Sequence, residues 1–216
     1  MGSTYTVKIA GPRLDSETAA AARQAVEGAL AGVVHRMSTY RDDSELSRFN
    51  QHRERAPFAL SGDTFAVFRL AQQVSAATDG AFDITVAPVV DAWGFGPGRV
   101  ERVVDPAEVA MLESRVGWRL LVLDERHATV AKVRPDVRAD LSGIAKGYAV
   151  DRAALALEAL GLGDFMIEAG GEIRTRGRNL QGRPWQIAIE RPDVVPQRAH
   201  RIVPLSDLAM ATSGDY

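Results

Sequence analysis

The sequence of 216 residues contains no cysteine. Disulfides, thiolate metal ligands and cysteine nucleophiles are therefore excluded for this chain. The sequence also has no apolar run long enough to span a bilayer and no stretch with the pattern of a signal peptide. Charge of one sign is not concentrated anywhere, and the formal net charge is −2. This balance disfavours a nucleic-acid groove or an anionic membrane surface as the partner.

The hydrophobic pattern predicts an α+β fold. With 46% hydrophobic residues the chain can bury a sizeable core, and no repeat or linker divides it, so we expect one compact domain over residues 1–216. Apolar residues at helical spacing predict helices over about 16–37, 61–80 and 144–161, another from Pro106, and a short capped turn at 42–50. Alternating or short apolar runs predict strands over 4–11, 118–124, 128–133, 137–141, 165–177 and 185–192.

The first unusual segment is DLSGIAKGYAVDRAA, residues 140–154, at an expected strand-to-helix junction. A helix N-terminus carries unpaired N–H groups and partial positive charge, so it attracts phosphate. Gly143 would let a ligand approach the backbone, and Lys146, one of only three lysines, would meet the same anion. Asp140 would suit a hydroxyl or an exocyclic amine. The alternative is that Ser142 merely caps the helix and Lys146 is solvated.

A second segment, TDGAFDITVAPVVDAWGFG at 78–96, combines glycine, aromatic residues and aspartate directly after a predicted helix. Phe82 and Trp93 can be core residues, which is the commoner place for aromatic side chains. Asp83 lies between apolar neighbours and needs a polar partner, for which a ligand donor is one candidate.

Two glycine-containing segments follow nearer the end of the sequence. In EAGGEIRTRG, Gly170 and Gly171 at the end of an apolar strand permit close backbone approach to a ligand, or else a bulge. In MATSGDY, Thr212 and Ser213 supply hydroxyls beside a glycine. Four such junctions in one chain favour a phosphate-bearing ligand, so Gly170, Gly171 and Thr212 are candidate contacts.

Taken in order, these segments resemble the ApbE family, the FAD:protein FMN transferases. The resemblance rests on MGSTYTVKI, MSTYRDDSELSRFN, GAFDITVAPVVDAWGFG, DLSGIAKGYAVDRAA, FMIEAGGEIRTRG and ATSGDY, which span nearly the whole chain in the family's order. It implies an α+β fold of two interleaved lobes, built from mixed or antiparallel sheet with helices, and a cleft for FAD between the lobes.

The resemblance also implies site residues by their positions. The family's segment that lies against the flavin matches Met1, Gly2 and Ser3, and the tyrosine that covers the isoalloxazine ring matches Tyr40. The family's further contacts to FAD match Ala81, Phe82, Asp83, Asp140 and Lys146. Gly143 matches the residue whose backbone carbonyl ligates Mg2+.

The implied activity is magnesium-dependent transfer of FMN from FAD to a threonine hydroxyl of an acceptor protein, with release of AMP. A tyrosine at position 40 resembles the transferases more than the members that mainly hydrolyse FAD to FMN and AMP, and FAD hydrolysis is the alternative. The family's acceptors resemble membrane redox subunits. Its members commonly work in the periplasm or anchored to the membrane, although a cytoplasmic place is not excluded.

One departure from the family concerns the metal site. After TSGDY the family continues with a segment like HIIDPxTG, which supplies a candidate base histidine and the aspartate and threonine ligands of Mg2+. This sequence ends first, and its four histidines lie elsewhere (His35, His52, His127 and His200). A backbone carbonyl alone does not hold Mg2+, so no catalytic residue is assigned, and we expect the sequence to be a piece of a longer protein. The alternative is a flavin-binding domain without activity.

Overall fold

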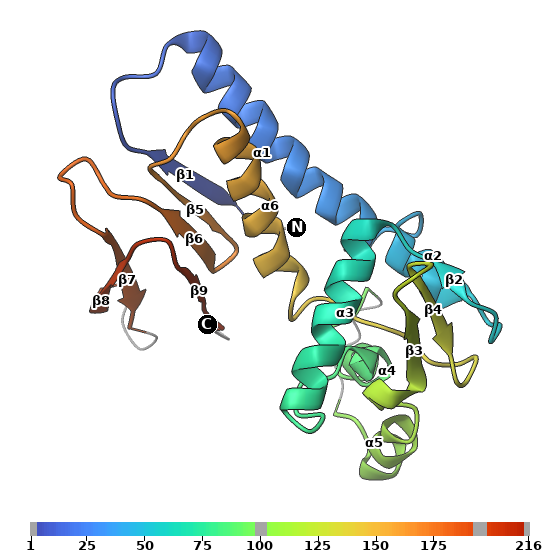
Figure 1. Cartoon of the computed structure of the whole chain (residues 1–216). Coiled ribbons are helices and arrows are strands. Elements are labelled where there is room, and N and C mark those ends of the chain that lie inside the picture. The colour runs from blue at the N-terminus through green and yellow to red at the C-terminus, as the bar shows by residue number, and fades with distance from the viewer. Residues whose placement is uncertain (1–3, 98–102, 192–197, 214–216) are drawn as a thin grey trace. The chain divides into compact units, whose positions relative to one another are not determined.

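The computed structural model of the chain describes residues 4–97, 103–191 and 198–213 (Figure 1). Its helices are α1 (Ser16–Met37), α2 (Glu45–Gln51), α3 (Gly62–Ala77), α4 (Ala87–Ala92), α5 (Pro106–Glu113) and α6 (Ala145–Ala159), with 3-10 turns η1 (Ile84–Val86) and η2 (Trp118–Leu120). Its strands are β1 (Tyr5–Ile9), β2 (Phe58–Ala59), β3 (Leu121–Asp124), β4 (Thr129–Lys132), β5 (Phe165–Ala169), β6 (Glu172–Arg176), β7 (Trp185–Glu190), β8 (Ala199–Leu205) and β9 (Ala209–Ala211).

The chain divides into two compact units. Unit 1 comprises Met1–Gly32 and Lys146–Tyr216, and unit 2 comprises Val33–Ala145. Unit 2 is therefore inserted into unit 1 in the sequence, and α1 begins in one unit and ends in the other. This interleaving and the mixture of helices with antiparallel sheets confirm the expected α+β class. The expected single domain and the expected cleft for FAD stay predictions.

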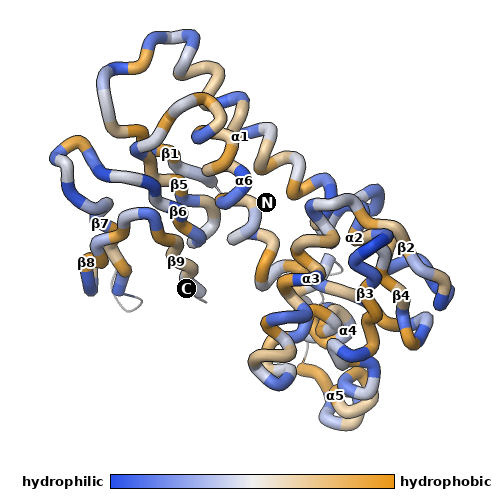
Figure 2. Tube along the Cα trace, viewed as in Figure 1, coloured by the Kyte–Doolittle hydropathy of each residue, from blue (hydrophilic) through white to orange (hydrophobic). Residues whose placement is uncertain are grey.

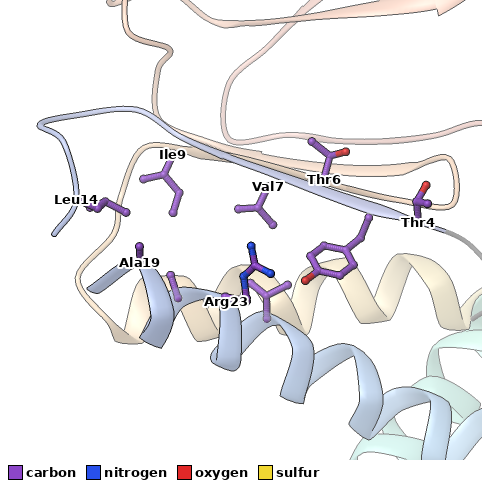
Figure 3. Close-up of a pocket in the computed structure, with 10 residues that line it drawn as sticks. Thr4, Thr6, Val7, Ile9, Leu14, Ala19 and Arg23 are labelled. Atoms are coloured by element: carbon purple, nitrogen blue, oxygen red, sulfur yellow. The ribbon is translucent and has the colours of Figure 1, made fainter. Parts of the chain in front are cut away.

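Unit 1 is built on a four-stranded antiparallel sheet in the order β1–β5–β6–β9. The pairing of β1 with β5 runs from Tyr5 opposite Ala169 to Ile9 opposite Phe165. Helices α1 and α6 cover one face of this sheet (Figures 1 and 3). The hairpin of β7 and β8 joins two sheet residues in a buried hydrophobic cluster (Met166, Ile173, Trp185, Ile187 and Leu205).

Unit 2 combines a three-stranded antiparallel sheet, β2–β4–β3, with the helices α2 to α5. Its core is centred on Phe49 of α2, whose ring meets the rings of Phe58 and Phe68 edge-on at centroid distances of 5.7 and 5.3 Å. Phe49 and Phe68 are fully buried. Hydrophobic residues also run along β3 (Figure 2). Leu121 of β3 and Val130 of β4 are buried and pack this sheet into the unit.

Capping chemistry explains where the helices begin. The side chain of Asp15 accepts a hydrogen bond from a backbone N–H in the first turn of α1 at 2.7 Å, and Ser44 does the same for α2 at 2.9 Å. Ser61 caps α3 in the same way. After α3, Gly80 adopts φ +83°, a conformation that favours glycine and lets the chain turn away.

The strand expected over 137–141 is the clearest error of the sequence analysis. Val137, Ala139 and Leu141 are fully buried, which matches the alternation of a strand, but this segment pairs with no strand among the described residues. Instead, the side chain of Asn50 bonds both backbone groups of Ala139. The helix α4 and the strands β8 and β9 were not expected. Within the described ranges, no helix has the length and apolarity needed to cross a bilayer.

Candidate functional site

Two of the motifs singled out in the sequence meet in unit 2. The backbone N–H of Asp140 donates to the carbonyl of Ile84 at 2.7 Å. A Cβ atom on Gly143 would lie 3.2 Å from Cε2 of Phe82, so the phenylalanine ring lies against this glycine. The AFD segment at 81–83 and the DLSG segment at 140–143 are therefore neighbours in the fold.

Both aspartates of these motifs are held through one carboxylate oxygen. Oδ1 of Asp83 accepts hydrogen bonds from the N–H and the hydroxyl of Thr85, at 2.8 and 2.7 Å, and caps η1. Oδ1 of Asp140 accepts a hydrogen bond from the N–H of Ser142 at 2.6 Å, and the Asp140 side chain is buried. Neither Oδ2 atom accepts a hydrogen bond from the described part of the chain, so each can receive a donor group of a ligand.

A cavity of about 270 Å³ opens beside Asp140 in unit 2. Its walls include Thr39, Asn50, Asp91 and Arg138. Arg138 is paired with Asp91 at 2.7 Å. Carboxylate, guanidinium and amide groups around one small cavity suit a polar ligand with hydroxyl or amine groups.

Tyr40 follows Thr39 of this cavity directly in the sequence. Its side chain is 58% exposed. The phenolic hydroxyl donates to the carbonyl of Phe95 at 3.1 Å, and the backbone N–H donates to Oγ of Ser38 at 3.1 Å. An aromatic ring that is anchored at its polar end and otherwise exposed is suited to stacking on a planar ligand.

Lys146 belongs to a second group of candidate residues, in unit 1. Its Nζ donates to the carbonyl of Gly170 at 2.8 Å and lies 2.9 Å from Oε2 of Glu172. This Oε2 atom is buried and accepts no well-aligned hydrogen bond from the described residues, so its contact with Lys146 is an ion pair. The lysine is thus docked on the glycine turn, and the alternative of a purely solvated lysine is wrong.

The turn between β5 and β6 is held by two side chains that bond Gly171. Gly171 has φ +92°, and its N–H donates to Oε1 of Glu168 at 3.1 Å. The hydroxyl of Thr212 donates to the carbonyl of Gly171 at 2.9 Å. A Cβ at position 171 would come within 3.0 Å of that hydroxyl, so both the conformation and the space require glycine here. Gly170, Gly171, Lys146 and Thr212 therefore form one local cluster.

A larger cavity of about 730 Å³ lies elsewhere in unit 1, between β1 and α1 (Figure 3). Val7 and Ile9 point from β1 toward the helix, whereas Thr4 and Thr6 point to the other side of the strand (Figure 3). Arg23 of α1 is the charged residue among those that line it. None of the described candidate FAD contacts lines this groove.

Metal ligands are sparse in the described part of the chain. No group of three or more His, Asp or Glu side chains there could hold a metal ion. Gly143 is exposed and offers one backbone carbonyl. Mg2+ requires near-octahedral oxygen coordination, so these residues alone do not fit it.

A model of the ApbE family matches residues 1–216. The chain belongs to the ApbE family. It is 43% identical over 221 residues to a protein of Haemophilus influenzae, and 43% identical over 219 residues to one of Vibrio cholerae; both are named FAD:protein FMN transferase. Each match covers 100% of this chain and 64% of the relative, so the chain spans just under two thirds of the relatives' length.

Solved structures of ApbE proteins share the fold. The flavin transferase ApbE from Vibrio cholerae has a TM-score of 0.88 at 43% identity, over 100% of this chain and 69% of that one. The Pseudomonas stutzeri flavinyl transferase ApbE, in its apo form, has a TM-score of 0.86 at 35% identity, over 100% of this chain and 66% of that one.

The candidate site residues fall into two groups. The structure places Tyr40, Ala81, Phe82, Asp83, Asp140 and Gly143 in unit 2, and Lys146, Gly170, Gly171 and Thr212 in unit 1. Met1, Gly2 and Ser3 lie outside the described residues. The roles of all these residues in binding FAD or Mg2+ stay predictions.

Sequence reasoning missed one residue that bonds a member or a neighbour of the candidate residues in each group. Glu172 follows the glycine pair and resembles any polar residue of a strand. Its sequence context therefore does not predict an ion pair with Lys146. Asn50 did leave a signal, because it directly follows Phe49 and lies four residues after Leu46, which places it on the same side of the helix as these two apolar residues. A polar residue on a buried face has to find a polar partner.

Proposed function

We propose that this chain carries out FMN transfer from FAD to a protein acceptor, with AMP as the second product. The observation that carries the proposal is the 43% identity, over the whole chain, to relatives named FAD:protein FMN transferase. The chain spans about 64% of those relatives. We therefore propose the activity for the whole protein that contains these 216 residues.

Unit 2 offers contacts for the flavin and for polar groups of FAD. In this proposal the exposed ring of Tyr40 stacks on the isoalloxazine, because two aromatic rings attract each other in an offset-stacked arrangement. Ala81, Phe82 and Asp83 contact FAD beside it, and Asp140 receives a hydroxyl or amine through its unbonded Oδ2. Gly143, without a side chain, leaves room for a close approach to the backbone.

Unit 1 offers a cation for the diphosphate. The Lys146 side chain is 36% exposed although it is paired with Glu172. Its ammonium has three N–H donors, so in this proposal it binds a phosphate oxygen while the pair with Glu172 is kept. The glycine turn at 170–171 and the hydroxyl of Thr212 are the neighbouring groups that a phosphate oxygen would meet.

The reaction is a phosphoryl-group displacement. The acceptor hydroxyl oxygen forms a bond to the FMN-side phosphorus while the bond from that phosphorus to the AMP phosphate oxygen breaks. AMP leaves with the bonding electron pair, and the hydroxyl proton passes to a base that we do not assign among the described residues. Positioning and electrostatic stabilisation supply most of the rate in such displacements.

The finer features of the proposal come from the family resemblance. They are a threonine as the acceptor residue, a membrane redox subunit as the acceptor protein, a requirement for Mg2+, and a place in the periplasm or at the membrane.

The test uses the protein as its gene encodes it, together with the 216-residue chain. Each is incubated with FAD, MgCl2 and a candidate redox subunit, and then flavin fluorescence in a denaturing gel and AMP by chromatography are measured. We expect a fluorescent acceptor band and an equal amount of AMP, both abolished by replacing the acceptor threonine with alanine. AMP without a labelled acceptor would instead indicate FAD hydrolysis. The absence of both products would refute the proposal.

A further inference from the structure

One buried side chain satisfies both backbone groups of the residue before Asp140. Nδ2 of Asn50 donates to the carbonyl of Ala139 at 2.8 Å, and Oδ1 of Asn50 accepts a hydrogen bond from the N–H of Ala139 at 2.7 Å. Asn50 is 8% exposed and Ala139 is fully buried. The carboxamide therefore replaces the strand partner that the alternating pattern at 137–141 predicts.

Helix α2, which carries Asn50, is itself fixed at both ends. At its start, the carboxylate of Glu45 accepts hydrogen bonds from the N–H and the hydroxyl of Ser61, at 2.6 and 2.7 Å. At its end, the buried ammonium of Lys132 donates to the carbonyls of Phe49 and His52, at 2.7 and 2.8 Å. Asn50 is therefore presented from a rigid support, and its two bonds transmit the position of α2 to Ala139.

The backbone of Asp140 is fixed as a consequence. Its own N–H is held by the carbonyl of Ile84, so the backbone is gripped at two successive residues. With Ala139 held by Asn50, the Cα–Cβ bond of Asp140 has little freedom of direction. Asn50 and Asp140 also line the same cavity.

We propose that Asn50 is a positioning residue for Asp140, which holds the backbone at Ala139 so that the Asp140 carboxylate presents Oδ2 to the ligand in one orientation. The consequence for binding rests on the proposed function, because Asp140 is proposed to contact FAD. The backbone restraint is independent of any ligand.

The experiment uses Asn50→Leu, which keeps a similar shape and removes both hydrogen bonds. Thr175→Val is the matched control: the buried Thr175 hydroxyl also bonds the N–H and the carbonyl of one distant residue, Leu208, but in unit 1. Amide hydrogen exchange is measured first, without FAD. We expect about tenfold or faster exchange at residues 139–142 in Asn50→Leu and unchanged exchange there in the control, because exchange follows local opening.

FAD affinity is then measured for Asn50→Leu, for Asp140→Ala and for the double variant. Each single change is expected to weaken binding about tenfold, the effect of losing one good hydrogen bond. The double variant is expected to bind no more weakly than Asp140→Ala alone, since Asn50 acts through Asp140. Thr175→Val is expected to bind FAD like the unchanged protein.

The outcomes separate this inference from the proposed function. Unchanged exchange at 139–142 in Asn50→Leu, or an FAD defect that persists in full when Asp140 is already alanine, would overturn it. If the unchanged protein binds no FAD, the proposed function fails, whereas the exchange data still decide whether Asn50 restrains Asp140. Should Asn50→Leu not fold, Asn50→Asp serves instead: it keeps the acceptor for the Ala139 N–H, so protection is expected to remain at 139 and to fall at 140–142.

Discussion

Lys132 gives the sharpest test of the energetics of unit 2. Its side chain is 2% exposed, and its Nζ lies 4.5 Å from the centre of the Phe49 ring in addition to its two backbone carbonyl bonds. Burial lowers the pKa of Lys132 from 10.5 to about 8, and the positive charges of Arg53 and Arg138 add to the lowering. The perturbation is Lys132→Met, which keeps most of the apolar stem and removes the titrating group.

The sign of the pH effect follows from proton binding. Between pH 8 and 10.5 the unfolded chain keeps the proton on Lys132 while the folded chain loses it, so the free energy of unfolding rises with pH. The shift from 10.5 to about 8 corresponds to about 3.5 kcal/mol at most, since one pKa unit is worth about 1.4 kcal/mol. The neutral amine still has two N–H donors, so both carbonyl bonds can survive deprotonation.

The assay is urea unfolding at pH 7, 8, 9 and 10 for the unchanged protein and for Lys132→Met. Both carry Trp185→Phe, so that the remaining tryptophans, Trp93 and Trp118, both report on unit 2. Subtraction of the two curves removes the titration of all shared groups. The difference in stability is expected to move in favour of the lysine protein as the pH rises. A flat difference, or one that falls above pH 8, would refute the reasoning.

Three further predictions concern single side chains. Tyr40→Ala should weaken FAD binding about tenfold while Tyr40→Phe should not, since the ring supplies the stacking; flavin fluorescence quenching measures this, and equal losses for both variants would contradict it. Gly171→Ala should lower stability by about 1–3 kcal/mol because of its φ of +92° and the nearby Thr212 hydroxyl, whereas Gly147→Ala, with open space in α6, should raise it; thermal unfolding compares the two. Lys146→Gln should weaken FAD binding and reduce its dependence on salt, with Lys8→Gln as the matched lysine control; an equal effect of both would argue against a contact between Lys146 and the diphosphate.

Much of the fold could be predicted because it is encoded locally. The caps at Asp15 and Ser61 stand directly before periodic apolar runs, and each does what its side-chain chemistry indicates. Strand β8 gave no such signal, since its residues Ala199 to Pro204 are mostly exposed and it exists because β7 pairs with it. Hydrophobic alternation cannot reveal a strand that is held mainly by its neighbour.

The candidate site shows the same division. The glycine positions and Asp140 could be singled out because glycine and aspartate stand out at the ends of the apolar runs that were expected to be strands. The position of Asp140 depends on its neighbour Ala139, which is bonded by Asn50 from 89 residues away along the chain. No short-range pattern contains that information. The error at 137–141 has the same cause: three buried alternating residues indicate an extended backbone, but they do not say whether a strand or a side chain satisfies it.

The insertion of unit 2 within unit 1 dictates an order of events as the protein is synthesised. Residues 33–145 are contiguous, so they can complete their own packing soon after they leave the ribosome. The strand at Tyr5–Ile9 precedes unit 2 in the sequence, yet the strand that pairs with it begins at Phe165, so it has no paired strand until all of unit 2 has been made. Throughout that interval its backbone is open to pairing with a nascent strand of another molecule, and the yield of correctly folded protein therefore depends on how this short strand is protected.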